Sequence, residues 1–222
     1  MDSGLVAQLV VYMVVLLLAV SAHEAAHAWM SYRFGDDTAR LLGRITLNPV
    51  MHIDPIGTLL LPIAGFIIAH MGGGIALIGW GKPTPVNPLR WRNKDVANVM
   101  VSIAGILANL TLASMALVAI KVIQYTHVLG EAAALGSIAE GLWTFLLTSV
   151  YLNVGLAVFN LIPIPPLDGS KILYTILPAD MHATLETLER FGFIILLVVV
   201  QTGILNVIFS PFMNIINFLV RL

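Results

Sequence analysis

The sequence contains no cysteine, and this absence excludes disulfide bonds and thiolate metal sites. Charge is also scarce, because only 10% of the residues are Asp, Glu, Lys or Arg, against about 25% in ordinary soluble domains. The formal net charge is −1 and no basic block is present, so we expect no nucleic acid partner. Apolar residues make up 59% of the chain, which is the composition of an integral membrane protein.

Five apolar segments are candidates for membrane helices, at residues 5–30, 56–78, 96–120, 141–167 and 191–220. The first contains one carboxylate, Glu24, and the others contain no Asp, Glu, Lys or Arg. About 20 apolar residues cross a bilayer as a helix, so we predict an all-α polytopic membrane protein with about five to six transmembrane helices. We expect the second helix to end near His70, and the last segment to be interrupted at Gly203 and Pro211.

We expect residues 1–222 to form a single membrane domain made of three parts: a core (5–33, 95–124 and 138–170), a second helix and strand region (41–93) and C-terminal helices (171–222). Basic residues gather in the short segments before and after the predicted core helices: Arg33, Arg40, Arg44, Lys82, Arg90, Arg92, Lys94, Lys171 and Arg190. Basic residues in short loops mark the cytoplasmic side. We therefore expect these loops to face the cytoplasm.

An HExxH motif, His23-Glu24-Ala25-Ala26-His27, closes the first apolar segment. Residues four apart share one helix face, so both imidazoles can reach one metal ion. A zinc ion there would make bound water acidic, and Glu24 could take up its proton. The alternative is a buried polar network without metal. A charged side chain in the bilayer costs roughly 2.5–3.5 kcal/mol, so either reading requires compensating partners.

A catalytic zinc site needs a third protein ligand beside an open position. Asp168 is the favoured candidate, because it follows the 141–167 segment on the side where His23 and His27 are expected. Its alternative role is to cap a helix that starts near Gly169. The other candidates are the remaining histidines and three loop aspartates: His52, His70, His127, His182, Asp36, Asp37 and Asp54.

Some of these candidates have simpler interpretations. Asp36 and Asp37 are predicted to be solvated loop charges, and Asp54 precedes Pro55 where it can cap the second helix. The expected topology places His70 and His127 toward the outer side, while His52 and His182 stay open.

The HExxH motif and the later Asn160-x-x-Pro163-x-x-x-Leu167-Asp168-Gly169 resemble the two motifs of the site-2 protease family of intramembrane zinc metalloproteases. The likeness covers nearly the whole chain and is that of a compact prokaryotic-type member without a PDZ or CBS domain. The resemblance implies one zinc ion per chain held by His23, His27 and Asp168, with Glu24 as the general base and no other cofactor.

The resemblance also implies a function. It is that of an intramembrane endopeptidase, which cuts within or beside a transmembrane helix of a membrane-tethered substrate during regulated intramembrane proteolysis. The expected location is a prokaryotic plasma membrane, with the active site toward the cytoplasm. The expected partners are the lipid bilayer and a transmembrane helical substrate; a homo-oligomer or a regulatory membrane partner is left open. The alternative is a proteolytically inactive scaffold that binds helices and retains a metal site, although such a site would not need Glu24.

Two asparagines are further candidates for the active site. Asn109 ends a Gly105-x-x-x-Asn109 element that resembles one in the family's third core span, and Asn160 belongs to the second motif. Either could bind substrate or stabilise a developing oxyanion. The alternatives are helix packing for Gly105 and Asn109, and capping of its own helix for Asn160.

Substrate binding predicts one more element. A helical substrate must unwind before its backbone can be attacked, and an unwound segment can add to an exposed strand edge. Residues 41–50 and 75–88 have strand-like composition bounded by proline or glycine. We therefore expect a small β-hairpin or re-entrant strand near the active site, with Ile45, Thr46 and Leu47 as its edge.

Overall fold

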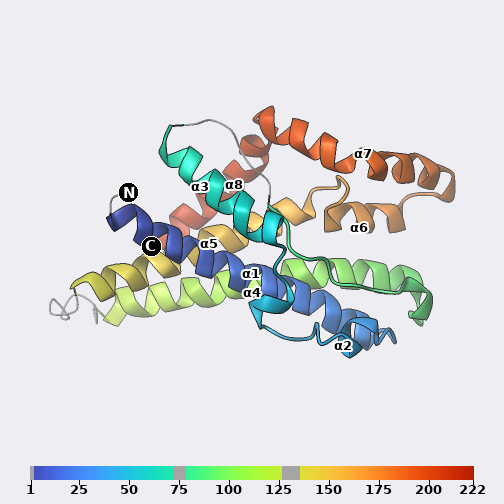
Figure 1. Cartoon of the computed structure of the whole chain (residues 1–222), viewed down its shortest axis with the longest axis horizontal. Helices are drawn as coiled ribbons and strands as arrows, with labels where there is room; N and C mark the ends of the chain where they lie inside the picture. Colours follow the sequence, from blue (N-terminus) through green and yellow to red (C-terminus); the bar gives the residue numbers. More distant parts are fainter. Residues whose placement is uncertain (1–2, 73–78, 127–135) are drawn as a thin grey trace.

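The computed structural model describes residues 3–72, 79–126 and 136–222, and all regular structure in these ranges is helical. The α-helices are α1 (Ser3–Arg33), α2 (Thr38–Leu41), α3 (Leu61–His70), α4 (Lys94–Thr126), α5 (Gly136–Leu161), α6 (Asp168–Ile176), α7 (His182–Gln201) and α8 (Ile204–Arg221) (Figure 1). A π-helical turn (Pro55–Leu60) leads into α3, and short 3₁₀ turns lie at Pro49–Met51, Pro88–Arg90 and Ala179–Met181. The all-α prediction is therefore confirmed.

Within the described ranges, four helices are long and apolar enough to cross a membrane: α1, α4, α5 and α8. The prediction of five to six is too high for the described residues. The apolar helix Pro55–His70 is shorter than a full span. Helix α7 is long enough, but its first half carries Glu186, Glu189 and Arg190, whose burial in lipid would be costly.

Helices α1, α4 and α5 form the centre of the molecule, with α4 packed against both of the others. In Figure 1 they lie side by side, and α4 runs opposite in direction to α1 and α5. Each of these helices has buried alanines, among them Ala19 of α1, Ala104 and Ala113 of α4 and Ala157 of α5. Small side chains let helices approach closely where lipid offers no hydrophobic driving force. This close packing brings side chains of α1 and α4 within hydrogen-bonding distance.

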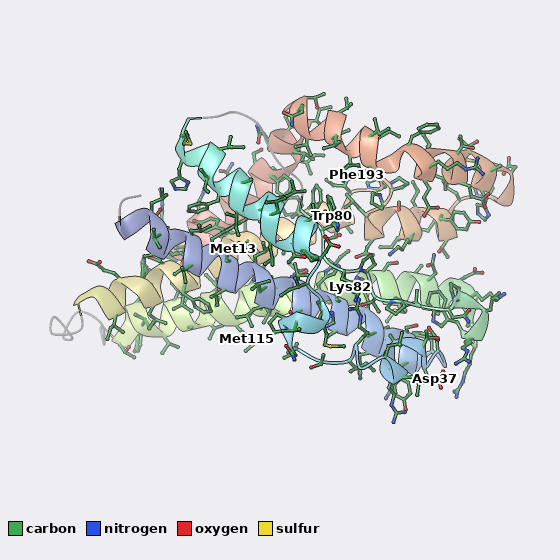
Figure 2. The ribbon with its side chains drawn as sticks, viewed as in Figure 1. Met13, Asp37, Trp80, Lys82, Met115 and Phe193 are labelled. Atoms are coloured by element: carbon green, nitrogen blue, oxygen red, sulfur yellow. The ribbon has the colours of Figure 1, made fainter. Side chains whose placement is uncertain are left out.

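Both chain termini lie at one end of the molecule, and α2, the start of α4 and α6 lie at the other (Figure 1). We call the second the basic end, because the loops at residues 33–44 and 90–94 carry six of the eleven Lys and Arg residues of the chain. Asp37 marks this end among the side chains (Figure 2).

The predicted β-hairpin is wrong for the described residues, which contain no strand. Around Ile45, Thr46 and Leu47 the chain instead forms local turns. The carbonyl of Thr46 accepts a hydrogen bond from His52 Nε2, at 2.9 Å. Pro49 has no N–H and begins a 3₁₀ turn. These local bonds occupy backbone groups that a strand would need for a partner.

The second strand candidate is extended but unpaired over residues 79–87, and residues 75–78 lie outside the described ranges. Three of its amides donate to different elements: Trp80 to the Gly57 carbonyl, Lys82 to the His52 carbonyl and Thr84 to the Glu24 carboxylate. The prolines at positions 83, 85 and 88 have no N–H, so the segment cannot form a continuous ladder.

The predicted helix boundaries are mostly confirmed. Helix α3 ends at His70, and Asp54 caps the turn before it by accepting from the amides of Ile56 and Gly57. Gly203, with φ +77°, separates α7 from α8. Pro211 does not end α8, which continues to Arg221.

Candidate active site

Two helices bring three candidate ligands to one point. His23 and His27 lie one turn apart on α1, and Asp168 is the first residue of α6. The Nε2 atoms of the two imidazoles are 2.9 Å apart and lie 3.2 Å (His23) and 3.1 Å (His27) from Asp168 Oδ2. All three side chains are buried. Within the described ranges this is the group of His, Asp and Glu side chains close enough to share a metal ion.

The chain turn before α6 sets the position of Asp168. Helix α5 ends at Leu161, and α6 starts so close to that end that a Cβ on Gly169 would lie 2.3 Å from the Leu161 carbonyl oxygen. Asp168 is the first helical residue and Leu167 is the N-cap residue, so the predicted alternative of a capping role is not what the geometry shows. One carboxylate oxygen accepts from Lys171 Nζ at 3.0 Å, and the other faces the two histidines.

Hydrogen bonds on the far side of each imidazole fix its tautomer. His27 Nδ1 lies 2.7 Å from the Val101 carbonyl oxygen, which can only accept, so this nitrogen carries the proton. His23 Nδ1 lies 2.8 Å from Asn109 Oδ1. The Asn109 amide nitrogen donates to the Ala19 carbonyl and to Asn153 Oδ1, so its oxygen must face His23. His23 therefore also carries its proton on Nδ1.

This arrangement leaves acceptors without protons at the centre of the cluster. In the neutral imidazoles both Nε2 atoms present lone pairs to each other and to Asp168 Oδ2. That carboxylate oxygen is buried and has no hydrogen-bond donor. A tetrahedral zinc ion with metal–ligand distances of ~2.0–2.1 Å holds its ligand atoms roughly 3.3 Å apart. The observed separations of 2.9–3.2 Å are close to that value, and the donor set is one that zinc accepts.

Gly105 of α4 forms the wall beside the two imidazoles. A Cβ at this position would lie 2.6 Å from His23 Cε1 and 2.6 Å from His27 Nε2. A side chain there would displace both rings, so the position requires glycine. Asn109 lies one turn further along the same helix and bonds to His23. The structure thus shows what the spacing in Gly105-x-x-x-Asn109 provides: room for the imidazoles and an acceptor for one of them.

Glu24 follows His23 on α1 and is held from outside the helix. Its Oε2 accepts from the Thr84 amide at 2.8 Å, and the Thr84 hydroxyl donates to the Glu24 carbonyl at 3.0 Å. Its Oε1 has no hydrogen-bond partner in the described part of the chain. Gly81 lies close by, where a Cβ would come within 2.7 Å of Val20 Cγ1. The extended 79–87 segment therefore packs on α1 at this level and orients the carboxylate.

The other candidates lie elsewhere or serve other contacts. Asn109 is fully buried behind His23, and Asn160 donates to the Leu156 carbonyl of its own helix at 3.0 Å. His52 and His182 bond to backbone carbonyls of Thr46 and Leu177, and His70 to that of Phe66. His127 lies outside the described residues.

Asp36 does not match its prediction as a solvated charge, because it is fully buried. It accepts from the amides of Thr38 and Asn87 and from the hydroxyls of Ser31 and Thr38. Burial would raise the pKa of this carboxyl, but the hydrogen bonds, led by the Asn87 amide, hold it below its ordinary value. Asp37, in contrast, lies at the surface and pairs with Arg90.

Three contributors were not anticipated from the sequence. Asn153 orients Asn109, Thr84 orients Glu24, and Lys171 holds the outer oxygen of Asp168. Lys171 stands three residues after Asp168, so helical spacing was a usable signal for it. Thr84 contacts Glu24 across 60 residues and Asn153 contacts Asn109 across 44, and no local pattern marks such pairs.

Comparisons with known proteins identify the family of this chain. Residues 11–200 match the family model Peptidase family M50. The chain is 38% identical over 204 residues to the "Putative zinc metalloprotease YwhC" of Bacillus subtilis, covering 91% of this chain and 86% of that protein. It is 32% identical over 191 residues to the "Putative zinc metalloprotease Rip2" of Mycolicibacterium smegmatis, covering 86% of this chain and 66% of that protein. The protein of the same name in Mycobacterium tuberculosis is 30% identical over 190 residues.

No solved structure gave a significant match. The family match covers both motifs and most of the described helices, including the HExxH segment of α1 and the start of α6. In the part of the chain that the structure describes, four helices are suited to cross a membrane. The chain therefore belongs to peptidase family M50, the site-2 protease family, and is a membrane-embedded zinc metalloprotease.

Proposed function

We propose that this protein is an intramembrane endopeptidase that hydrolyses peptide bonds within or beside a transmembrane helix of a membrane-tethered substrate. His23, His27 and Asp168 hold one zinc ion per chain, and Glu24 is the general base. The convergence of two unprotonated imidazole nitrogens and a donor-free carboxylate oxygen, carried by the apolar helix α1 and by α6, supports this proposal most strongly. Residues 1–222 act as one domain in it.

Each residue near the metal has a distinct task. Zinc, when bound, supplies a Lewis acid that makes water a stronger nucleophile at neutral pH. Glu24 accepts a proton from the attacking water and returns it to the leaving amine. The Thr84 amide holds Oε2 of Glu24, which leaves Oε1 for the proton. Asn109 and Val101 keep the imidazoles in the tautomer that directs Nε2 toward the metal.

The position of the motif along α1 supports cleavage inside the membrane boundary. His23 lies about 28 Å along the helix from Gly4, and Arg33 lies about 15 Å beyond it, at ~1.5 Å per residue. With the hydrocarbon core about 30 Å thick, the site falls near one face and below the basic end. Basic residues favour the cytoplasmic side, so we propose that this end faces the cytoplasm. The relatives named above come from bacteria, so we propose a prokaryotic plasma membrane as the location.

The decisive experiment replaces Glu24 by Gln in the full chain. Gln keeps an oxygen that can accept from the Thr84 amide, so the fold and zinc content should be unchanged. Cleavage of a designed transmembrane substrate in proteoliposomes should fall by about 10²–10⁴-fold, the usual contribution of a general base. Glu140→Gln is the matched control, because Glu140 is exposed near the start of α5 and should leave cleavage unchanged.

Two outcomes would contradict the proposal. If neither the wild type nor Glu24→Gln cleaved the substrate, and both bound it equally, the result would favour the inactive scaffold. Equal cleavage of a soluble peptide with the same scissile sequence would show a metalloprotease that does not require a membrane-embedded substrate.

A further inference from the structure

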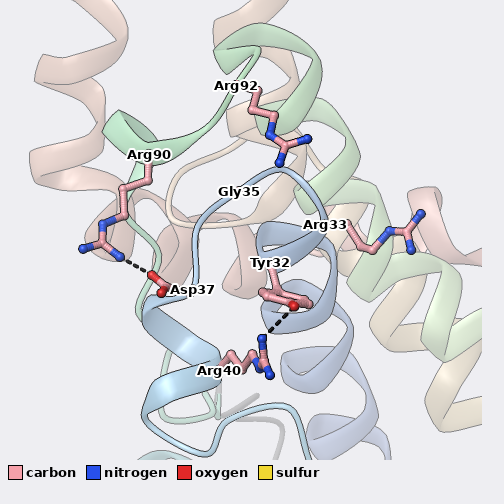
Figure 3. Close-up of a pocket in the computed structure, with 7 residues that line it drawn as sticks. All are labelled: Tyr32, Arg33, Gly35, Asp37, Arg40, Arg90 and Arg92. Carbon is pink, nitrogen blue, oxygen red and sulfur yellow. Dashed lines mark hydrogen bonds and ion pairs between the residues drawn. The ribbon is translucent and has the colours of Figure 1, made fainter.

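A cavity of about 820 Å³ lies where α1 ends at the basic end of the molecule. Figure 3 shows its lining: Tyr32, Arg33, Gly35, Asp37, Arg40, Arg90 and Arg92. The lining contains four arginines and one aspartate, so these residues give it a formal charge of +3. It does not contain the residues of the active site described above.

Two separate chain segments build this cavity and are joined rigidly. The Arg92 amide donates to the Phe34 carbonyl at 3.0 Å, and the Trp91 indole donates to the Ser31 hydroxyl at 2.8 Å. Buried Asp36 accepts from the Asn87 amide at 2.7 Å. The backbone that carries the arginines is therefore fixed in the absence of any ligand, which favours binding because less order has to be imposed.

The four arginines differ in whether their guanidinium groups already have a hydrogen-bond partner. Arg90 pairs with Asp37, and Arg40 donates to the Tyr32 hydroxyl at 2.6 Å and stacks over its ring (Figure 3). Among the described residues, neither Arg33 nor Arg92 has a carboxylate or a hydrogen-bond acceptor for its guanidinium group. Arginine presents a planar fork of donors that matches the oxygens of a phosphate. Arg33 and Arg92 both line this cavity, so two such donor groups are available there for a phosphate anion.

Apolar residues next to the arginines indicate which phosphate this is. Leu41 and Leu42, which follow Arg40, are 75% and 56% exposed, and Leu89, which precedes Arg90, is 80% exposed. Trp29, one turn before Arg33, is 49% exposed, and the Arg33 guanidinium lies 5.9 Å from its ring centre. A tryptophan at the end of an apolar span is typical of the membrane interface, and the exposed leucines beside it offer apolar surface to acyl chains. A soluble phosphate would gain nothing from them.

We propose that this cavity binds the phosphate group of an anionic membrane phospholipid, with Arg33 and Arg92 as its principal contacts. The preference for basic residues on the cytoplasmic side accounts for arginines in these loops. It does not account for arginines from two segments converging on one cavity with two guanidinium groups left unpaired. Bound lipid would bridge the end of α1 to the segment that carries Arg92.

The test measures lipid binding by the full chain and does not depend on proteolysis. The delipidated protein in neutral detergent is titrated with phosphatidylglycerol, with phosphatidylcholine of the same acyl chains, or with inorganic phosphate, and bound lipid is counted by native mass spectrometry. We compare wild type with Arg33→Gln/Arg92→Gln. Arg190→Gln/Arg221→Gln removes two exposed charges outside the cavity and is the matched control.

We expect one phosphatidylglycerol to bind wild type and the control at least about tenfold more tightly than phosphatidylcholine, a difference of about 1.4 kcal/mol. Both lipids carry the phosphate, but the positively charged lining would repel the choline cation of phosphatidylcholine. The Arg33→Gln/Arg92→Gln variant should lose this preference and keep the wild-type melting temperature in lipid-free detergent. Equal binding of the two lipids, or an unchanged preference in that variant, would overturn the proposal. So would displacement of the lipid by millimolar inorganic phosphate, which would identify a site for a soluble anion.

Discussion

Two buried aspartates of this protein, Asp36 and Asp168, differ in how their oxygens are satisfied. Asp36 is fully buried and accepts four hydrogen bonds, two of them from backbone amides. Asp168 is 4% exposed, and one of its oxygens accepts from Lys171 while the other has no donor. Both carboxylates lie among residues brought together from distant parts of the chain. Only one of them is left with unused acceptor capacity.

The comparison separates a structural carboxylate from a ligand. A buried charge is costly unless it is paired or hydrogen-bonded, and Asp36 meets this condition with protein groups alone. Asp168 meets it only in part, and its free oxygen faces two imidazole nitrogens that have no proton to offer. A bound cation would compensate the charge on this oxygen. Burial by itself would not have distinguished the two residues.

The largest expected effect comes from exchanging the Asp168 carboxylate for an amide, with the same exchange at Asp36 as the comparison. In Asp168→Asn, zinc affinity and activity should both fall. The loss should exceed the roughly 10–100-fold that is typical when a residue that only supports a metal ligand is changed. Asp36→Asn should keep zinc, because Asp36 is not among the residues that converge on the metal site. Zinc content by elemental analysis, with cleavage of the transmembrane substrate, measures both. Zinc loss in Asp36→Asn alone would reverse the two assignments.

Gly105, which lies beside the two imidazoles of the metal site, provides the next test. Gly105→Ala places a methyl group within 2.6 Å of both imidazoles, so the rings must move and zinc affinity should fall by at least about tenfold. Gly141→Ala is the control, because a Cβ there has no neighbour within 4 Å. Competition with a fluorescent zinc chelator measures the affinity. Equal affinities in the two variants would mean that the histidines do not hold the metal in this geometry.

The asparagine behind His23 sharpens the comparison further. Asn109→Ala removes the acceptor that fixes the His23 tautomer, and zinc affinity should fall by about 10–100-fold. Asn153→Ala, one hydrogen bond further away, should have a smaller effect of the same kind. If Asn109 instead stabilised an oxyanion, its replacement would lower kcat and leave zinc affinity as in wild type. Chelator competition and steady-state kinetics together decide between these roles.

The smallest expected effect concerns Asp36, whose carboxylate is fully hydrogen-bonded, and the pH dependence of its contribution to stability. The pKa of Asp36 is lowered in the folded protein, so its ionised form stabilises the fold above the ordinary pKa near 3.9. Asp36→Asn should reduce the free energy of unfolding by about 2–3 kcal/mol at neutral pH. The difference between wild type and variant should shrink as the pH falls through the lowered pKa. Thermal melts from pH 7 to pH 3 measure it, and a constant difference would contradict the assignment.

The residues differ in how far the sequence alone could identify their roles. His23, Glu24 and His27 were visible because helical spacing converts an HExxH pattern directly into one face. Asp168 was favoured because it follows a span whose end lies on the same side as the histidines. The prediction that Asp36 is solvated is wrong, since its four donors come from residues up to 51 positions away. Ile45, Thr46 and Leu47 have strand-forming side chains, but no neighbouring strand is available to pair with them in the described structure.

The sequence by itself determined the apolar helices, the paired motifs and the basic loops, because spacing along one helix and hydrophobicity along one segment are local properties. The tertiary structure alone decided that Asp168 meets His23 and His27, that Asn109 sets a tautomer, that Thr84 orients Glu24 and that four arginines share a cavity. These outcomes depend on how separate helices and loops pack against one another, and tens of residues of intervening chain leave that packing undetermined until the whole fold has formed.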